Sequence, residues 1–127
     1  ALLNDVAIDF IEFDITDNKY YNNLNIYDII ISNPPYVTEK EKTIMKKNVL
    51  NHEPHSALFV PDNNPLKFYK YIAEFAKHHL MPDGKIYLEI NCAFAVEIST
   101  LFRQYGFRKV LIKKDLFSKD RFAEIAF

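Results

Sequence analysis

An apolar run that ends at two consecutive prolines constrains the fold of this chain more than any other feature. Tyr27 to Ser32 is rich in β-branched residues and has the length of a buried strand, and Asn33-Pro34-Pro35-Tyr36 follows it directly. Each proline biases the residue before it away from the helical region, so the backbone is held extended here. The strand must therefore end at this point. In open α/β sheets, ligands bind beside the carboxyl ends of such strands.

The same four residues suit the recognition of a planar –NH₂ group. The Asn33 side-chain oxygen and the Pro34 carbonyl oxygen can both accept hydrogen bonds from one amide or amino nitrogen. Tyr36 offers a flat face on which a conjugated group can stack. The alternative is a strand end broken by two prolines, with an aromatic residue behind it by chance. The position at the end of a buried strand favours the binding site.

Composition indicates one packed domain without a membrane-spanning segment. The chain has 127 residues, 49% of them hydrophobic, and no apolar stretch approaches the roughly 20 residues of a membrane helix. With 16 basic and 17 acidic residues, the chain has no overall attraction for phosphate, which argues against direct nucleic-acid binding. The single cysteine, Cys92, excludes an internal disulfide and suits a cytoplasmic location. Gly84 and Gly106 are the only glycines, which excludes a glycine-rich nucleotide loop within this sequence.

Strand and helix patterns alternate along the chain and predict an α/β sheet. The last two strands are joined by only about seven residues, too few for a parallel crossover, so this pair should be antiparallel. The expected strands cover 6–13, 27–32, 85–91, 107–113 and 121–127. One helix should begin at Pro65 with Asn64 as its cap, and a second should be closed by Gly106. We expect a turn at 82–84, a loop over 38–48 with a short helix around Ile44 and Met45, and a loop over 51–64.

Within this outline the chain resembles a known enzyme family. Asn33-Pro34-Pro35-Tyr36 is similar to the signature of methyltransferases that modify exocyclic or amide nitrogens. Several downstream blocks are similar to those of the HemK-type protein-(glutamine-N5) methyltransferases, which modify the Gly-Gly-Gln glutamine of peptide chain release factors. These blocks are Met45 with Asn48-Val49-Leu50, Glu53-Pro54, Ala57-Leu58-Phe59, Phe68-Tyr69, Leu80-Met81-Pro82-Asp83-Gly84, Leu88-Glu89-Ile90, and Asp115 with Asp120-Arg121. The resemblance covers essentially the whole chain.

The resemblance implies a fold, a cofactor, a partner and roles for particular residues. The implied fold is the S-adenosylmethionine-dependent methyltransferase (Rossmann-like) α/β sheet with an antiparallel terminal strand. The implied cofactor is S-adenosyl-L-methionine, and the implied partners are release factors. The residues concerned are, for the substrate, Asn33, Pro34, Pro35, Tyr36, Glu53 and Pro54, of which Asn33, Pro34 and Tyr36 would be catalytic, and, for the cofactor, Asp14 and Asn33.

Three departures from the family pattern stand out. Asn91 and Ser118 occupy positions where the family usually has glycine, which should alter local turns only. Family members also carry, upstream of this region, a helical domain and a strand–Gly-rich loop–helix–strand unit that holds the cofactor. We therefore interpret residues 1–127 as the C-terminal portion of the catalytic domain, without the first two strands of its sheet. Such a piece should be inactive alone and should self-associate through its exposed strand edges.

Two other functions stay open at this point. Enzymes that methylate N6 of adenine or N2 of guanine in nucleic acid use the same Asn-Pro-Pro-Tyr arrangement, but they must flip a base and neutralise phosphates. The second alternative is a non-catalytic fragment that kept the acceptor site and lost the cofactor.

The remaining reactive side chains have simpler interpretations. His52 and His55 flank Glu53-Pro54, but nothing supplies a third and a fourth ligand, so we expect no metal. Cys92 should be a small buried residue at a strand end. Glu89 and Arg121 are expected to be structural.

Overall fold

A four-stranded sheet organises the computed structural model, which describes residues 4–45 and 52–127. The order of the strands in space is β1 (Tyr27–Ser32), β4 (Leu80–Glu89), β6 (Asp120–Ala126) and β5 (Lys109–Lys114). β1 and β4 are parallel, whereas β6 is antiparallel to both of its neighbours. The predictions of an α/β sheet, of the strand over 27–32 and of an antiparallel terminal pair are confirmed.

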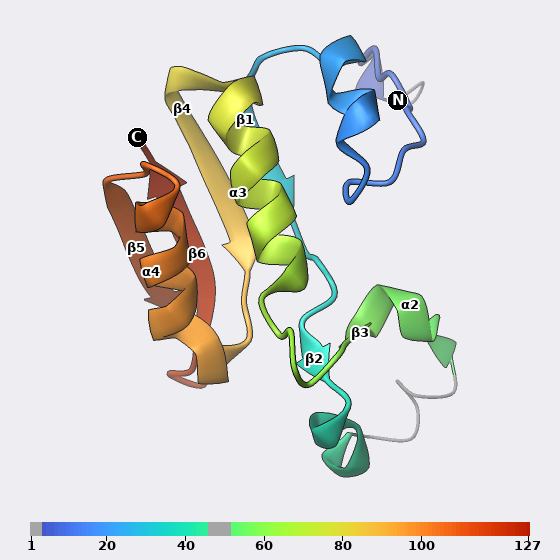
Figure 1. Ribbon diagram of the computed structural model, residues 1–127, viewed down its shortest axis with the longest axis vertical. Coiled ribbons are helices and arrows are strands. Elements are labelled where there is room, and N and C mark those ends of the chain that lie inside the picture. The colour runs from blue at the N-terminus through green and yellow to red at the C-terminus, as the bar shows by residue number, and fades with distance from the viewer. Residues whose placement is uncertain (1–3, 46–51) are drawn as a thin grey trace.

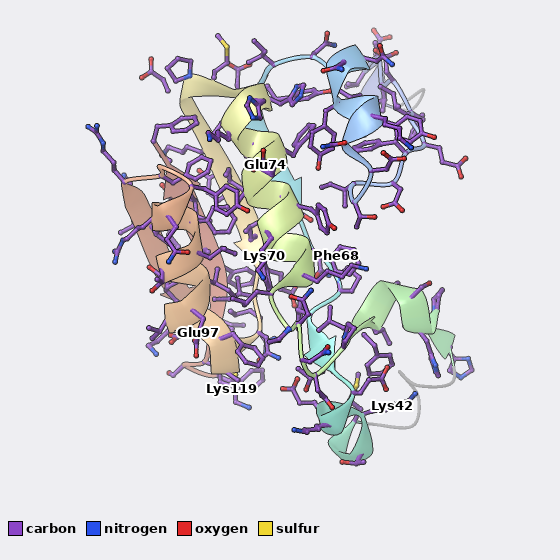
Figure 2. All side chains as sticks on the ribbon, in the orientation of Figure 1. Lys42, Phe68, Lys70, Glu74, Glu97 and Lys119 are labelled. Atoms are coloured by element: carbon purple, nitrogen blue, oxygen red, sulfur yellow. The ribbon has the colours of Figure 1, made fainter. Side chains whose placement is uncertain are left out.

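Two helices, α3 (Lys67–His79) and α4 (Ala95–Gln104), cover one face of this sheet (Figure 1). The alternation along β4 explains the core between them, because Ile86, Leu88 and Ile90 point to the helices and are at most 1% exposed. Figure 2 shows the polar side chains of the helices, such as Lys70 and Glu97, on the side turned away from the sheet. The apolar stripe of each helix thus packs on the sheet as its spacing predicts.

The helix ends agree with the sequence in one case and differ in the other. α4 ends in a turn closed by Gly106, whose φ of 98° is left-handed, with Phe107 N donating to Phe102 O at 3.1 Å. α3 begins at Lys67, not at Pro65, and no side-chain hydrogen bond caps it. Asn64 contributes its backbone carbonyl to Lys67 N instead, so the prediction of Asn64 as a side-chain cap is wrong.

The segment over 6–13 is not a strand, which corrects the prediction. It pairs with no other segment in the described residues, and Val6, Ile8, Phe10 and Ile11 are between 50% and 88% exposed. A strand needs a neighbour to satisfy its N–H and C=O groups, and loose apolar alternation does not provide one. The chain regains regular structure only at the 3₁₀ helix η2 (Asn18–Asn23).

The expected turn at 82–84 is also absent, because these residues belong to β4. The register with β1 jumps here from Tyr27↔Leu80 to Ile29↔Lys85, so the segment forms an irregularity within the strand. At Gly84 a Cβ would lie 2.9 Å from the Asp28 carbonyl oxygen. Glycine is therefore required for close backbone approach at this position, and not for a reversal of the chain.

A smaller unit follows the end of β1 and lies apart from the main sheet in Figure 1. Its two short strands, β2 (Val37–Thr38) and β3 (Phe59–Val60), are parallel partners. The 3₁₀ helix η3 (Lys40–Ile44) and the one-turn helix α2 (His55–Leu58) lie between them in sequence. A short helix is present within 38–48, but η3 ends at Ile44 and so lies earlier than the expected position around Ile44 and Met45. The rest of that range, from residue 46, lies outside the described residues. The loop expected over 51–64 instead contains α2 and β3.

None of the helices in residues 4–45 and 52–127 has the length and apolar composition that a bilayer crossing requires.

Candidate acceptor-binding site

The Asn33–Tyr36 loop leaves the sheet at the carboxyl end of β1, beside the end of β4, where Ser32 is paired with Leu88. Asn33 is exposed and Pro34 is buried, so the proline anchors the loop while the amide side chain faces solvent. In the part of the chain that the structure describes, the Asn33 side chain and the Pro34 carbonyl oxygen make no hydrogen bond. Both oxygens are available to accept hydrogen bonds from a ligand.

Tyr36 is fixed by a polar network at the far end of the same loop. Its hydroxyl donates to Glu89 Oε1 at 2.6 Å and accepts from Arg121 Nη1 at 3.3 Å. Arg121 Nε in turn lies 3.5 Å from Asp115 Oδ2. Burial, aided by the hydrogen bond to Glu89, raises the pKa of Tyr36 to about 12. The hydroxyl therefore remains protonated near neutral pH and keeps its bond to the carboxylate.

This network assembles residues that the sequence placed in separate blocks. Glu89 ends β4, Arg121 belongs to β6, and Asp115 lies between β5 and β6. Glu89 and Arg121 contact the Tyr36 hydroxyl, and Asp115 is linked to it through Arg121. The ring of Tyr36 packs against the hydrophobic core. Sequence reasoning took Glu89 and Arg121 as structural and missed that they hold this tyrosine. The available signal was that both residues lie in blocks that carry the family resemblance.

A shallow hollow of about 350 Å³ reaches Asn33 along the face of the sheet that the helices leave open. Its walls are mainly apolar and include Ile31, Tyr87 and Phe122, with Glu89 at the same end as Asn33. Asn33 thus stands where an apolar surface meets polar groups. This combination is common in sites for small organic groups.

The other candidates for substrate binding lie in the smaller unit. Glu53 and Pro54 are exposed, and the Pro54 carbonyl oxygen accepts from Ala57 N at 2.9 Å as α2 begins. Pairing of β2 with β3 connects this region to the end of the Asn33–Tyr36 loop. No hydrogen bond joins Glu53 to that loop among the described residues. Asn48-Val49-Leu50 lie outside the described residues.

Asp14, the candidate cofactor residue, does not follow a strand as expected. Its carboxylate accepts from Thr16 N and Thr16 Oγ1, both at 2.8 Å, which lowers its pKa and keeps it ionised. Asp14 lines a hollow with Tyr20 and other residues of the N-terminal segment, whereas Asn33 lines the hollow on the sheet. The two candidates therefore do not form one site for S-adenosylmethionine by themselves, and further residues would have to complete it.

The structure corrects one minor expectation. Cys92 is exposed at the start of the 3₁₀ helix η4 (Cys92–Phe94), so the prediction that it is buried is wrong. Ile90, two residues earlier, is buried instead. Within residues 4–45 and 52–127, no three His, Cys, Asp or Glu side chains are placed to hold a metal ion.

Several curated methyltransferases match this chain. A release factor glutamine methyltransferase from Flavobacterium psychrophilum is 44% identical over 127 residues, which is 100% of this chain and 44% of the relative. One of the same name from Bacteroides thetaiotaomicron is 54% identical over 95 residues, 75% of this chain and 34% of its own length. A bifunctional methyltransferase from Rickettsia typhi is 40% identical over 114 residues, 88% of this chain and 22% of the relative. No family model matches.

The chain spans less than half the length of each of these relatives. The alignment with the Flavobacterium protein nevertheless extends over all 127 residues, so it spans the Asn33–Tyr36 loop and the Glu89 and Arg121 regions. The resemblance expected from the sequence is thereby confirmed. The chain is a sequence relative of the release factor glutamine methyltransferases.

Proposed function

We propose that this chain supplies the acceptor side of the active site of a protein that methylates the Gly-Gly-Gln glutamine of release factors at N5. The observation that carries the proposal is the pair of unengaged oxygens, Asn33 Oδ1 and Pro34 O, at the end of β1. A primary amide has two N–H donors on one nitrogen, which such a pair can accept. The names of the relatives support glutamine as the amide.

The chemistry required of these residues is orientation. The lone pair of an amide nitrogen is delocalised into its carbonyl, so the nitrogen must be aimed at the methyl carbon. Hydrogen bonds to Asn33 and Pro34 would hold the nitrogen in line, and their oxygens would stabilise the positive charge that develops as the N–C bond forms. The ring of Tyr36 would stack on the amide plane, and Pro35, Glu53 and Pro54 would shape the wall of the pocket.

No strong general base is needed in this scheme. As the new N–C bond forms, the nitrogen becomes acidic and loses its proton to water or a nearby carbonyl oxygen. S-adenosylmethionine, when bound, supplies the methyl group and takes back the electron pair of the broken S–C bond. Asp14 and Asn33 would contribute contacts to it.

We further propose that residues 1–127 form the C-terminal portion of a methyltransferase sheet whose first two strands belong to a preceding segment. The relatives are more than twice as long as the region they share with this chain. The strand order β1-β4-β6-β5 with an antiparallel end agrees with such a sheet. By itself, the 127-residue chain should not transfer methyl groups.

Incubation of the full-length protein with labelled S-adenosylmethionine tests this function. One reaction contains a release factor, one contains the same factor with the Gly-Gly-Gln glutamine changed to glutamate, and one contains DNA. We expect label in the first reaction only, at the side-chain nitrogen of that glutamine. Label that enters only the DNA would overturn the proposal in favour of a nucleobase acceptor. If none of the three reactions acquires label, the protein is non-catalytic.

A further inference from the structure

Asn91 connects the acceptor loop to three other parts of the molecule. It lies two residues after the end of β4 and is 5% exposed. Its side-chain Nδ2 donates to the Tyr36 carbonyl oxygen at 3.1 Å and to Glu41 Oε2 at 2.9 Å. Its Oδ1 accepts from Ala93 N at 3.0 Å, at the start of η4. The amide therefore uses both of its donor hydrogens and its acceptor, which fixes its orientation.

Glu41 is the second member of this contact and belongs to η3, in the smaller unit. Its Oε2 also accepts from Thr38 N and Thr38 Oγ1, both at 2.8 Å. Burial raises the pKa of Glu41, but the hydrogen bonds from Thr38 and Asn91 outweigh this effect, so the pKa is lowered and the group is ionised near neutral pH. Hydrogen bonds to a charged acceptor are stronger than neutral ones.

These bonds hold the loop at the end opposite to Asn33. Pro34 and Pro35 stiffen the backbone between the strand and Tyr36, so a displacement of the Tyr36 carbonyl would be transmitted to the acceptor oxygens. The Tyr36 hydroxyl is already fixed by Glu89 on the main sheet. The carbonyl is fixed separately, and its donor comes from Asn91 alone among the described residues.

We propose that Asn91 and Glu41 are positioning residues that set the aim of the Asn33–Tyr36 loop. Asn91 holds the loop in place by donating a hydrogen bond to the Tyr36 carbonyl oxygen. The Glu41 carboxylate fixes the side-chain rotamer of Asn91 in which this hydrogen bond forms. This inference rests on the proposed function, because the loop is the proposed acceptor site. It goes further by assigning a role to a residue that replaces the usual glycine and was expected to affect only a local turn.

An exchange of the two functional groups separates positioning from simple stability. Asn91→Asp alone puts two carboxylates in contact and should lower the melting temperature. The double variant Asn91→Asp/Glu41→Gln restores one amide and one carboxylate, so the contact between the two elements is rebuilt. However, a carboxylate at position 91 cannot donate to the Tyr36 carbonyl oxygen. Leu101→Ala, at a buried position of α4, serves as a control that lowers stability without removing a hydrogen bond of the loop.

The first readout is the NMR spectrum of the 127-residue chain. In the double variant we expect the melting temperature to recover most of the loss caused by Asn91→Asp. The Tyr36 carbonyl carbon and the Asn33 side-chain amide signals should stay displaced from their wild-type positions. In Leu101→Ala the melting temperature should fall while those signals stay in place. Wild-type Tyr36 and Asn33 signals in the double variant would overturn the proposal.

The second readout is single-turnover methyl transfer to a saturating release factor by the full-length protein. The double variant should transfer the methyl group about tenfold more slowly with an unchanged substrate affinity. The reason is that the acceptor nitrogen is less well oriented, whereas the contacts that bind the release factor are kept. An unchanged rate would overturn the positioning role. If the wild-type protein methylates no glutamine, the proposed function fails, and the spectrum alone then decides whether Asn91 positions the loop.

Discussion

The two faces of the sheet carry similar residues and have opposite environments. On the helix-covered face, Ile86 and Leu88 of β4 are 0% and 1% exposed. On the open face, Ile29 and Ile31 of β1 are 56% and 77% exposed, and Phe122 of β6 is 45% exposed. Leaving an isoleucine or phenylalanine side chain exposed to water has the same free-energy cost on either face of the sheet. The open face therefore has the composition of a surface that is meant to be covered.

The open face also carries a group of paired charges. Glu124 lies between Lys85 at 3.3 Å and Lys113 at 2.5 Å and is 8% exposed. The acceptor loop lies at the boundary between the two faces. Its Tyr36 packs against the core, whereas Asn33 borders the open hollow. The candidate site is thus anchored on the helix-covered face of the sheet and opens towards the uncovered face.

The largest expected difference between the faces is in core packing. Ile86→Ala should lower the free energy of unfolding by about 2–5 kcal/mol, because it leaves a cavity beneath the helices. Ile31→Ala, a matched change on the neighbouring strand, should cost no more than about 0.5 kcal/mol. Urea unfolding followed by circular dichroism at low protein concentration measures both. Equal losses for the two variants would mean that the open face is packed in solution and would break the comparison.

Self-association should depend on the open face and on the free edge of β1. An apolar edge strand is a template for pairing with another chain, and a lysine there opposes pairing. In sedimentation velocity, the 127-residue chain should form oligomers as its concentration rises, and Ile31→Lys should weaken this association about tenfold. Val96→Lys, on the outer side of α4 at a site that is 76% exposed, is the control and should change nothing. A strictly monomeric wild-type chain with a normal melting transition would contradict the expectation.

The smallest effect concerns the charges of the open face. The hydrogen bond from Lys113, followed by that from Lys85, holds the pKa of Glu124 below its usual value of 4.5. The folded state therefore binds protons less readily than the unfolded state, so this contribution to stability is complete above pH 4.5 and is lost as the pH falls through the lower folded pKa. Glu124→Gln should show a shallower loss of unfolding free energy below pH 4.5 than the wild type. Parallel pH profiles would show that the lysines do not stabilise the carboxylate.

The contrast between residues 6–13 and 27–32 shows what the sequence could predict. Both segments are apolar enough for a strand, but among residues 4–45 and 52–127 only the second has a neighbour, β4, to pair with. Hydrophobic pattern reports which side chains prefer burial, and it does not report whether a partner is present. The antiparallel terminal pair was predictable because the length of its connection excludes the other geometry. The irregular β4 was not, since Pro-Asp-Gly is also typical of a turn.

The site divides in the same way. The position of Asn33 and Pro34 at the carboxyl end of β1 could be predicted because they directly follow its apolar run and share a stiff backbone. The residues that hold Tyr36 could not, because Glu89 and Arg121 lie 53 and 85 positions away in sequence. Likewise, Asn91 is separated from Tyr36 by 55 positions. Contacts of this range depend on how β1, β4 and β6 are brought together, which the local pattern does not specify.

Single-turnover methyl transfer to a release factor by the full-length protein, with and without Asn33→Ala, tests the central claim most directly. The account predicts that the rate constant at saturating substrate falls by about 10²–10³-fold, the usual cost of removing one oriented group that stabilises developing charge. Asn64→Ala, before α3, is the matched control and should transfer at the wild-type rate. A rate constant unchanged by Asn33→Ala would contradict the assignment of this side chain as the acceptor clamp.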